Sequence, residues 1–308
     1  MAFFRLFAAP RHGQLLPADV LLAFVHAAFA VLWLPHVAHA WEPRWFLAAH
    51  LAAALLLPAL LERATRPLNG AVAVLRDLYP VACVALMWGE LGVRWTWSRN
   101  DANDQFIATL DRQLAGLAPH EQFMASAPQL GLLMHGAYLA YYALLIGVPA
   151  VLLLRDAATR QDTALRISAT YLLCFTIAAA FPVRGPFDMT HVPVAVAGAD
   201  GGFFRPLILG IRAAGDSLGT AFPSTHTAGA VTFAILIWRR FAGFWRPAGV
   251  ALAVLIAVST VYTRNHFLMD MLAGSVVALV AQFWLVPLLE RTPRSLRLAA
   301  PGADPVTA

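Results

Sequence analysis

Long apolar segments are the feature that most restricts the folds open to this chain. Eight of them follow one another along its 308 residues. About 20 helical residues cross a hydrocarbon layer of about 30 Å. Lipid offers no hydrogen-bond partners, so a spanning backbone satisfies its own polar groups only as a helix or a closed barrel. The segments are residues 18–35, 45–61, 72–92, 129–154, 165–182, 225–240, 247–263 and 266–289. The sequence therefore predicts an all-α fold, a polytopic membrane helical bundle of about eight transmembrane helices.

Composition supports a membrane protein and excludes several other classes. Hydrophobic residues make up 60% of the chain, charged residues 13%, and the mean hydropathy is +0.66, which is outside the range of soluble domains. All 22 basic residues are arginines scattered near segment ends, so we expect no nucleic-acid partner. Cys83 and Cys174 fall in apolar segments and have neither a disulfide pattern nor metal-ligand spacing.

The arginines also predict an orientation in the membrane. Alternating segments place 14 arginines on one face and eight on the other. Cytoplasmic loops carry the excess of basic residues, so the first face is expected in the cytoplasm. That face holds Arg5, Arg11, Arg63, Arg66, Arg76, Arg155, Arg160, Arg166, Arg239, Arg240, Arg246, Arg291, Arg294 and Arg297. The first apolar segment lacks a small-residue cleavage site and is expected to be a retained helix.

Two loops on the opposite face, residues 93–128 and 183–224, are long enough to carry structure of their own. In the first, apolar residues recur at helical spacing opposite a polar face, which predicts an amphipathic helix along the lipid headgroups. These residues are Ile107, Leu110, Leu114 and Leu117. The second loop directly precedes a polar motif and is a candidate lid over a substrate.

Two short polar motifs, at residues 222–227 and 259–270, interrupt the apolar pattern. The 39 residues from 227 to 265 contain four arginines and no acid. Three of the arginines, Arg239, Arg240 and Arg246, are grouped near the middle, and the length of the stretch fits a helical hairpin with a basic turn. A hairpin returns the chain to the face that it left, so we expect His226 and His266 at the same depth. His266 and Asp270 are four residues apart and share one face of a helix.

These residue types suit transfer of a phosphoryl group. Asp270 would orient the His266 imidazole and leave its other nitrogen free to attack. The alternative interpretation is a histidine at a helix end whose bond to the carboxylate only satisfies a partly buried pair. The helix start at Ser224 and Thr225 offers amides and hydroxyls to an anion as well as an N-cap. His226 would donate a proton to the leaving oxygen.

The sequence leaves open the roles of two arginines and the presence of a metal site. Arg184 and Arg264 either clamp phosphate in a bidentate manner or extend toward the headgroups. A zinc site formed by His226, His266 and Asp270, with His191 as a fourth ligand, is possible in principle. No HExxH-like cluster supports it, and we expect neither a metal nor another cofactor.

The two histidine motifs resemble signatures of a known family. Residues 223–226 (Pro-Ser-Thr-His) and 266–270 (His-Phe-Leu-Met-Asp) resemble the second and third motifs of the type-2 phosphatidic acid phosphatase (PAP2) superfamily. The resemblance covers roughly residues 95–290 and is nearest to the branch that includes inositol phosphorylceramide synthases. The features of that branch are residues 107–111 (Ile-Ala-Thr-Leu-Asp), 138–142 and 259–262 (Ser-Thr-Val-Tyr).

This resemblance implies a six-helix core and a metal-independent reaction in which His266 forms a phosphohistidine. Asp270 would orient it, His226 would be the general acid, and Ser224 would hold phosphate oxygens. The chain departs from the family at three positions. Thr225 replaces the usual glycine, Thr260 the usual arginine and Ile177 the usual lysine. Arg264 is then the arginine nearest to the third motif.

We expect three parts: membrane spans over residues 1–92, a PAP2-like catalytic region over 93–290, and a basic, disordered cytoplasmic tail over 291–308. The expected activity is that of an extracytoplasmic phosphatase for lipid phosphates or pyrophosphates. Transfer of a phospholipid headgroup to an alcohol is the alternative. A non-enzymatic lipid transporter is a further alternative, but transporters place polar groups near the membrane midplane and have internal repeats, and neither pattern is visible.

Overall fold

The chain folds as a bundle of helices. The computed structural model describes residues 15–63, 70–116, 118–189 and 201–291, and these contain no strand. Every apolar segment predicted to span the membrane is helical, which confirms the polytopic helical fold. The helices are α2 (Pro17–Trp33), α3 (Trp41–Arg63), α4 (Gly70–Ser98), α7 (Gly131–Leu153), α8 (Ala157–Ala180), α11 (Thr225–Arg240), α12 (Trp245–Tyr262) and α13 (Leu268–Val280). A π-helical turn over Ala281–Leu285 connects α13 to α14 (Val286–Arg291).

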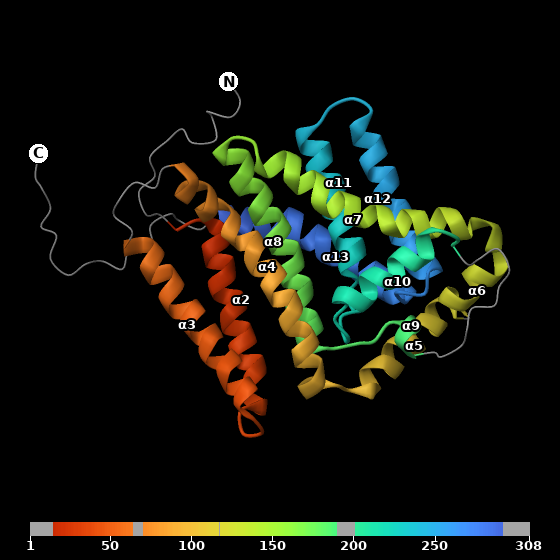
Figure 1. The fold of residues 1–308 in the computed structure, drawn as a ribbon, viewed down its shortest axis with the longest axis horizontal. Helices are drawn as coiled ribbons and strands as arrows, with labels where there is room; N and C mark the ends of the chain where they lie inside the picture. Colours follow the sequence, from red (N-terminus) through yellow and green to blue (C-terminus); the bar gives the residue numbers. More distant parts are fainter. Residues whose placement is uncertain (1–14, 64–69, 117, 190–200, 292–308) are drawn as a thin grey trace, which may run out of the picture.

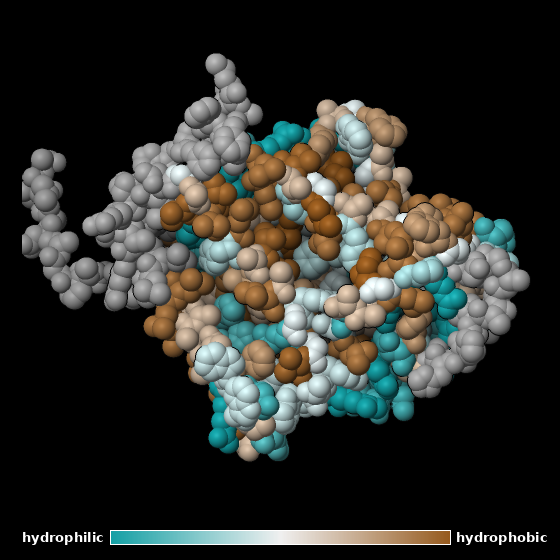
Figure 2. Space-filling view, viewed as in Figure 1, coloured by the Kyte–Doolittle hydropathy of each residue, from teal (hydrophilic) through white to brown (hydrophobic). Residues whose placement is uncertain are grey.

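Among the described residues, six helices are long and apolar enough to cross a membrane. They are Pro17–His36, Gly70–Ser98, Pro128–Leu153, Ala157–Ala180, Trp245–Tyr262 and Leu268–Arg291. Of the eight predicted spans, α3 and the 16-residue α11 are not in this set. Figure 2 shows hydrophobic residues over much of one face and hydrophilic residues along its lower margin, near α5. The chain is therefore a multi-pass membrane protein.

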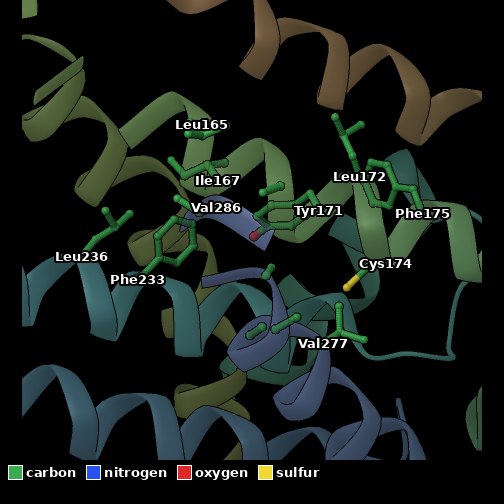
Figure 3. Close-up of a cluster of buried hydrophobic side chains, with 14 of the residues drawn as sticks. Leu165, Ile167, Tyr171, Leu172, Cys174, Phe175, Phe233, Leu236, Val277 and Val286 are labelled. Atoms are coloured by element: carbon green, nitrogen blue, oxygen red, sulfur yellow. The ribbon is translucent and has the colours of Figure 1, made fainter. Parts of the chain in front are cut away.

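Helix α8 lies at the centre of the bundle. In its most apolar 18-residue stretch, 78% of the residues are buried, against 28% in the corresponding stretches of α4 and α7. Helix α8 packs against α2, α4, α7 and α11. Leu172 and Phe175 of α8 are buried, as are Phe233 of α11 and Val286 of α14 (Figure 3). This core fixes the helices that carry the histidine motifs.

The first two spans, α2 and α3, pair at one side of the bundle (Figure 1). Buried hydrogen bonds join them to α4: Trp33 Nε1–H donates to Glu90 Oε1 over 2.6 Å, and His50 Nε2 lies 2.8 Å from the same oxygen. Helix α4 continues to Ser98, beyond the boundary expected at residue 92. The N-terminal spans and the rest of the bundle are thus connected by one unbroken helix.

The two long loops predicted at residues 93–128 and 183–224, named the outer loops after the side expected for them, contain short helices at the end of the bundle opposite the α11–α12 turn (Figure 1). They are α5 (Asp101–Ala115), α6 (Pro119–Ser126), α9 (Pro186–Met189) and α10 (Phe204–Gly215). A 3₁₀ turn at Pro128–Leu130 leads into α7.

Helix α5 does not pack as its hydrophobic pattern predicts. It buries Asp104 and Asp111 beside Ile107, whereas Leu114 is exposed. The two carboxylates turn inward because an arginine and the start of α13 offer them hydrogen-bond donors. Leu117, His191 and the tail after residue 291 lie outside the described residues.

Candidate active site

The two histidine motifs meet where α11 and α13 begin. The Ser224 amide donates to the Asp270 carbonyl over 3.0 Å, which joins the start of α11 directly to the first turn of α13. A Cβ on Gly274 would collide with the Ser224 carbonyl. The glycine therefore permits the close approach of the two helices.

His226 and His266 lie side by side in this junction. His266 Nε2 is 3.4 Å from His226 Nδ1, and the ring centroids are 5.5 Å apart. His266 is only 5% exposed, and His226 is half-buried. The hairpin predicted from the spacing of the motifs thus places both imidazoles in one site.

The orientation of the His266 ring is fixed from its Nδ1 side. Nδ1 lies 2.9 Å from the Ala221 carbonyl, and because a carbonyl only accepts, Nδ1 must carry the proton. The lone pair of the neutral ring is therefore on Nε2, which faces His226. Ala221 is held in turn by its amide, which donates to the Val183 carbonyl over 3.0 Å.

Asp270 contacts both the start of α13 and His266. Its Oδ2 accepts the Phe267 amide over 2.8 Å, which caps α13, and it also lies 3.5 Å from His266 Nδ1. The carboxylate is fully buried. Next to it, Asp111 of α5 accepts the Met269 amide at Oδ1 over 3.0 Å. A helix of the first outer loop thus supports the turn that carries Asp270.

Tyrosines of α7 surround His226. The ring of Tyr138 stacks on the imidazole at 4.8 Å, and the ring of Tyr141 lies 4.4 Å away. The Tyr142 hydroxyl is 3.3 Å from His226 Nε2. The sequence pointed to this tyrosine stretch only through its family resemblance, and the structure places it against the histidine.

A polar pocket extends from the two histidines. The residues that line it come from α4, α7, α9, α10, the segment 216–221 after α10, and the two motifs. They include Trp88, Tyr138, Asp188, Arg212, Asp216, Ser217, Thr220, Thr225, His226, Asn265 and His266. Ser224 is not in the lining because its Oγ accepts the Thr227 amide over 3.2 Å and caps α11. Of the two hydroxyl residues expected at this helix start, Thr225 faces the pocket.

The two arginines expected to bind phosphate do not line this pocket. Arg184 is held by α5: its Nε donates to Asp104 Oδ2 over 2.7 Å, and a terminal nitrogen donates to Asp101 over 3.0 Å. Arg264 lines a small neighbouring cavity. Instead, Arg212 of α10 reaches the histidine pocket. Nothing in the local sequence around Arg212 marks it, because its role depends on the fold of the second outer loop.

Arg212 forms an ion-paired group with two acids. It lies 2.9 Å from Asp188 and 3.0 Å from Asp216. Burial raises the pKa of the Asp216 carboxyl above its ordinary value, while Arg212 opposes this shift. The pocket therefore combines one cation with two acids, and burial favours the neutral form of one of them, Asp216.

An apolar groove of about 430 Å³ adjoins the polar pocket. Its walls come mainly from α4, α7 and α8 and carry side chains such as Val84, Leu145 and Phe175. Trp88, Arg212, Asp216, Thr225 and His226 line both the groove and the pocket. A molecule with one polar and one hydrocarbon end can thus place each end in matching surroundings.

No group of three or more His, Cys, Asp or Glu side chains within the described residues is arranged to hold a metal ion. His191, the fourth ligand considered for a zinc site, lies outside those residues. Asp270, His266 and His226 instead lie in a row, with Asp270 Oδ2 3.5 Å from His266 Nδ1 and His266 Nε2 3.4 Å from His226 Nδ1.

Comparison with known proteins gives one match. A family model described as the PAP2 superfamily matches residues 105–284, which is more than half of the chain. The matched stretch contains both histidine motifs and α10, and it begins after α4. No curated protein and no solved structure matches the chain.

Proposed function

The chain belongs to the PAP2 superfamily, whose members are generally phosphoesterases, and from that premise we propose that it is a membrane-embedded phosphatase for lipid phosphates or pyrophosphates. In this proposal His266 is the nucleophile, Asp270 and the Ala221 carbonyl orient it, and His226 is the general acid.

The observation that carries the proposal is the continuity of the polar pocket with the apolar groove. The two share His226, Thr225 and Arg212, so a phosphate beside the histidines would have a hydrocarbon channel directly next to it. A soluble phosphate ester has no apolar chain to bury in this groove, whereas burial of a lipid chain there is favourable. The substrate class is therefore a phosphate ester of a lipid.

In the first step, His266 Nε2 attacks phosphorus, and the bond from phosphorus to the ester oxygen breaks. His226 gives its proton to that oxygen, which leaves as an alcohol or, from a pyrophosphate, as a lipid monophosphate. The imidazole of His266 becomes positively charged as the phosphohistidine forms. Asp270, whose Oδ2 is 3.5 Å from Nδ1, stabilises this charge.

In the second step, water attacks the phosphohistidine and the phosphorus–nitrogen bond breaks. His226, which lost its proton in the first step, takes one from the water. Inorganic phosphate leaves, and both histidines return to their starting forms. Throughout, Thr225 and the positive end of α11 would bind phosphate oxygens.

Transfer to an alcohol is the second candidate, as in the inositol phosphorylceramide synthases that the motifs resemble. The burial of His266 favours it, because exclusion of bulk water protects a reactive intermediate from hydrolysis. In that reaction the transferred phosphate would carry its headgroup to a lipid hydroxyl.

The site is proposed to open on the extracytoplasmic side of the membrane. His226 lies at the start of α11 and His266 just before the start of α13, whereas Arg239, Arg240 and Arg246 lie at or just beyond the other end of α11. Basic residues favour the cytoplasmic side, so the arginine turn would face the cytoplasm and the histidines the outside.

The test measures phosphate release from lipid phosphates, including phosphatidic acid and undecaprenyl pyrophosphate, by the purified full chain in detergent with EDTA. His266→Ala should lower the rate by about 1,000-fold or more, as expected for loss of a nucleophile. His39→Ala, on an exposed turn, is the matched control and should retain wild-type activity. Loss of activity with EDTA, or full activity of His266→Ala, would refute the mechanism.

If the wild type releases no phosphate, inositol- and choline-phospholipid donors with ceramide or diacylglycerol acceptors test the second candidate. Headgroup transfer that depends on His266 would establish a phosphotransferase. Transport of lipid that is insensitive to His266→Ala would instead favour the non-enzymatic alternative.

A further inference from the structure

Arg212 has a position that no other described residue shares. It lines the histidine pocket, the apolar groove and the small cavity that also contains Arg205 and Arg264. Its side chain is only 14% exposed. A group bound beside the histidines, with a hydrocarbon chain in the groove, would therefore lie next to this guanidinium.

The guanidinium is held on several sides. One terminal nitrogen donates to Asn265 Oδ1 over 2.7 Å and lies 3.0 Å from Asp216. The other lies 2.9 and 3.1 Å from the two oxygens of Asp188, and the group stacks over the Phe187 ring at 4.5 Å. Asn265 directly precedes His266, so the first contact fixes the cation beside the nucleophile. A preorganised guanidinium loses little freedom when it binds an anion.

The arginines named by the sequence motifs are placed differently. Arg184 is taken up by Asp104 and Asp101 of α5, and its guanidinium lies 5.9 Å from the ring centroid of Trp95. Neither Arg184 nor Arg264 is in the lining of the histidine pocket. A phosphate group there needs a cation to offset its charge, and Arg212 is the arginine that the described lining provides.

We infer that Arg212 binds the substrate phosphate beside His266, in the role that the sequence motifs suggest for Arg184 and Arg264. The planar guanidinium can bind two phosphate oxygens at once. It would exchange at least one carboxylate contact, with Asp188 or Asp216, for the substrate. Those acids hold Arg212 in place before an anion binds. They make entry of an anion selective, because only a group that binds the guanidinium well displaces them.

This inference relies on the proposed function for the identity of the substrate, but phosphate binding can be tested separately. Binding of inorganic phosphate to the full chain in detergent would be measured by calorimetry. Arg212→Gln should weaken it by about 100-fold, and Arg212→Lys, which keeps the charge but not the two-pronged contact, by about tenfold. Arg112→Gln removes an arginine from the exposed side of α5 and should leave binding unchanged.

Arg212→Gln leaves Asp188 and Asp216 without their cationic partner, so folding needs its own control. The double variant Arg212→Gln with Asp216→Asn removes one of these charges, and its thermal unfolding would be compared with the wild type. Weak phosphate binding by a folded double variant supports the inference. Wild-type affinity in any folded Arg212→Gln protein, or no phosphate binding by the wild type, overturns it.

The same variants separate this inference from the proposed function. If the wild type binds phosphate through Arg212 but releases none from lipid esters, the proposed hydrolysis fails and the assignment of Arg212 stands. If the wild type hydrolyses lipid phosphates and Arg212→Gln keeps both KM and kcat, the assignment of Arg212 fails alone.

Discussion

Asp111 is expected to hold the catalytic end of α13 in place, although it does not line the histidine pocket. It is fully buried, its Oδ1 accepts the Met269 amide over 3.0 Å, and its Oδ2 lies 3.6 Å from His120 Nδ1. Met269 is the residue before Asp270. Asp111→Ala would therefore leave a buried amide without an acceptor and loosen the turn that orients His266.

The magnitude follows from what the carboxylate does. Loss of a side chain that caps a helix costs about 1 kcal/mol, and loss of a negative charge near the helix start adds about 0.5 kcal/mol. About 2 °C of melting temperature per kcal/mol for a chain of this size gives a decrease of about 3 °C. Asp111→Asn keeps an acceptor oxygen of the same shape and should lose about 1 °C or less.

The assay combines thermal unfolding in detergent with phosphate release from the best lipid substrate. For Asp111→Ala, the kcat should fall more than the KM rises, because the substrate-binding groups are unchanged and Asp270 is not. Glu121→Ala is the matched control. Like Asp111, Glu121 is an acid of the same loop near His120, at 3.8 Å, but its side chain is 56% exposed. If Asp111→Ala unfolds at the wild-type temperature with wild-type kcat, the proposed link from α5 to the site is incorrect.

Two further changes test the packing and the charge of the site. Gly274→Ala would place a methyl group against the Ser224 carbonyl and separate α13 from α11, so both melting temperature and kcat should fall. Gly89→Ala, where no atom lies within 4 Å of the added carbon, is the control and should leave both at wild-type values. A Gly274→Ala protein with unchanged melting temperature and kcat would contradict the close-packing argument. The charged and titratable groups near Asp216 are Arg212 of α10, Asp188 of α9 and His266, and burial raises the pKa of the Asp216 carboxyl. As pH falls through that raised pKa, the wild type loses a negative charge from the pocket and should bind inorganic phosphate more tightly. Asp216→Asn is uncharged throughout, so it should bind phosphate more tightly than the wild type above that pKa and equally below it, and identical affinities at all pH values would show that Asp216 does not face the bound anion.

Much of the architecture follows from the sequence because its signals are local. Each predicted membrane segment became a helix, since a long apolar run in lipid has few other ways to satisfy its backbone. The 39-residue interval brought His226 and His266 together as a hairpin must. Asp270 lies 3.5 Å from His266 Nδ1 as the spacing of the two residues suggested, but not on a shared helix, because His266 precedes Phe267, the N-cap of α13. The superfamily predicted from the two motifs is confirmed by the family match, and its inositol phosphorylceramide synthase-like branch stays a prediction.

The tertiary structure decided which groups surround the histidines. Hydrophobic periodicity predicted that α5 would lie on the headgroups, but it gives no account of the donors that draw Asp104 and Asp111 inward. Motif spacing likewise pointed to Arg184, which Asp104 binds, whereas Arg212 reaches the pocket from a loop helix. The Ala221 carbonyl has no side-chain signal at all. These contacts join residues about 45 to 160 positions apart, and the energy of such pairs depends on the packing of the whole bundle, which no local pattern encodes.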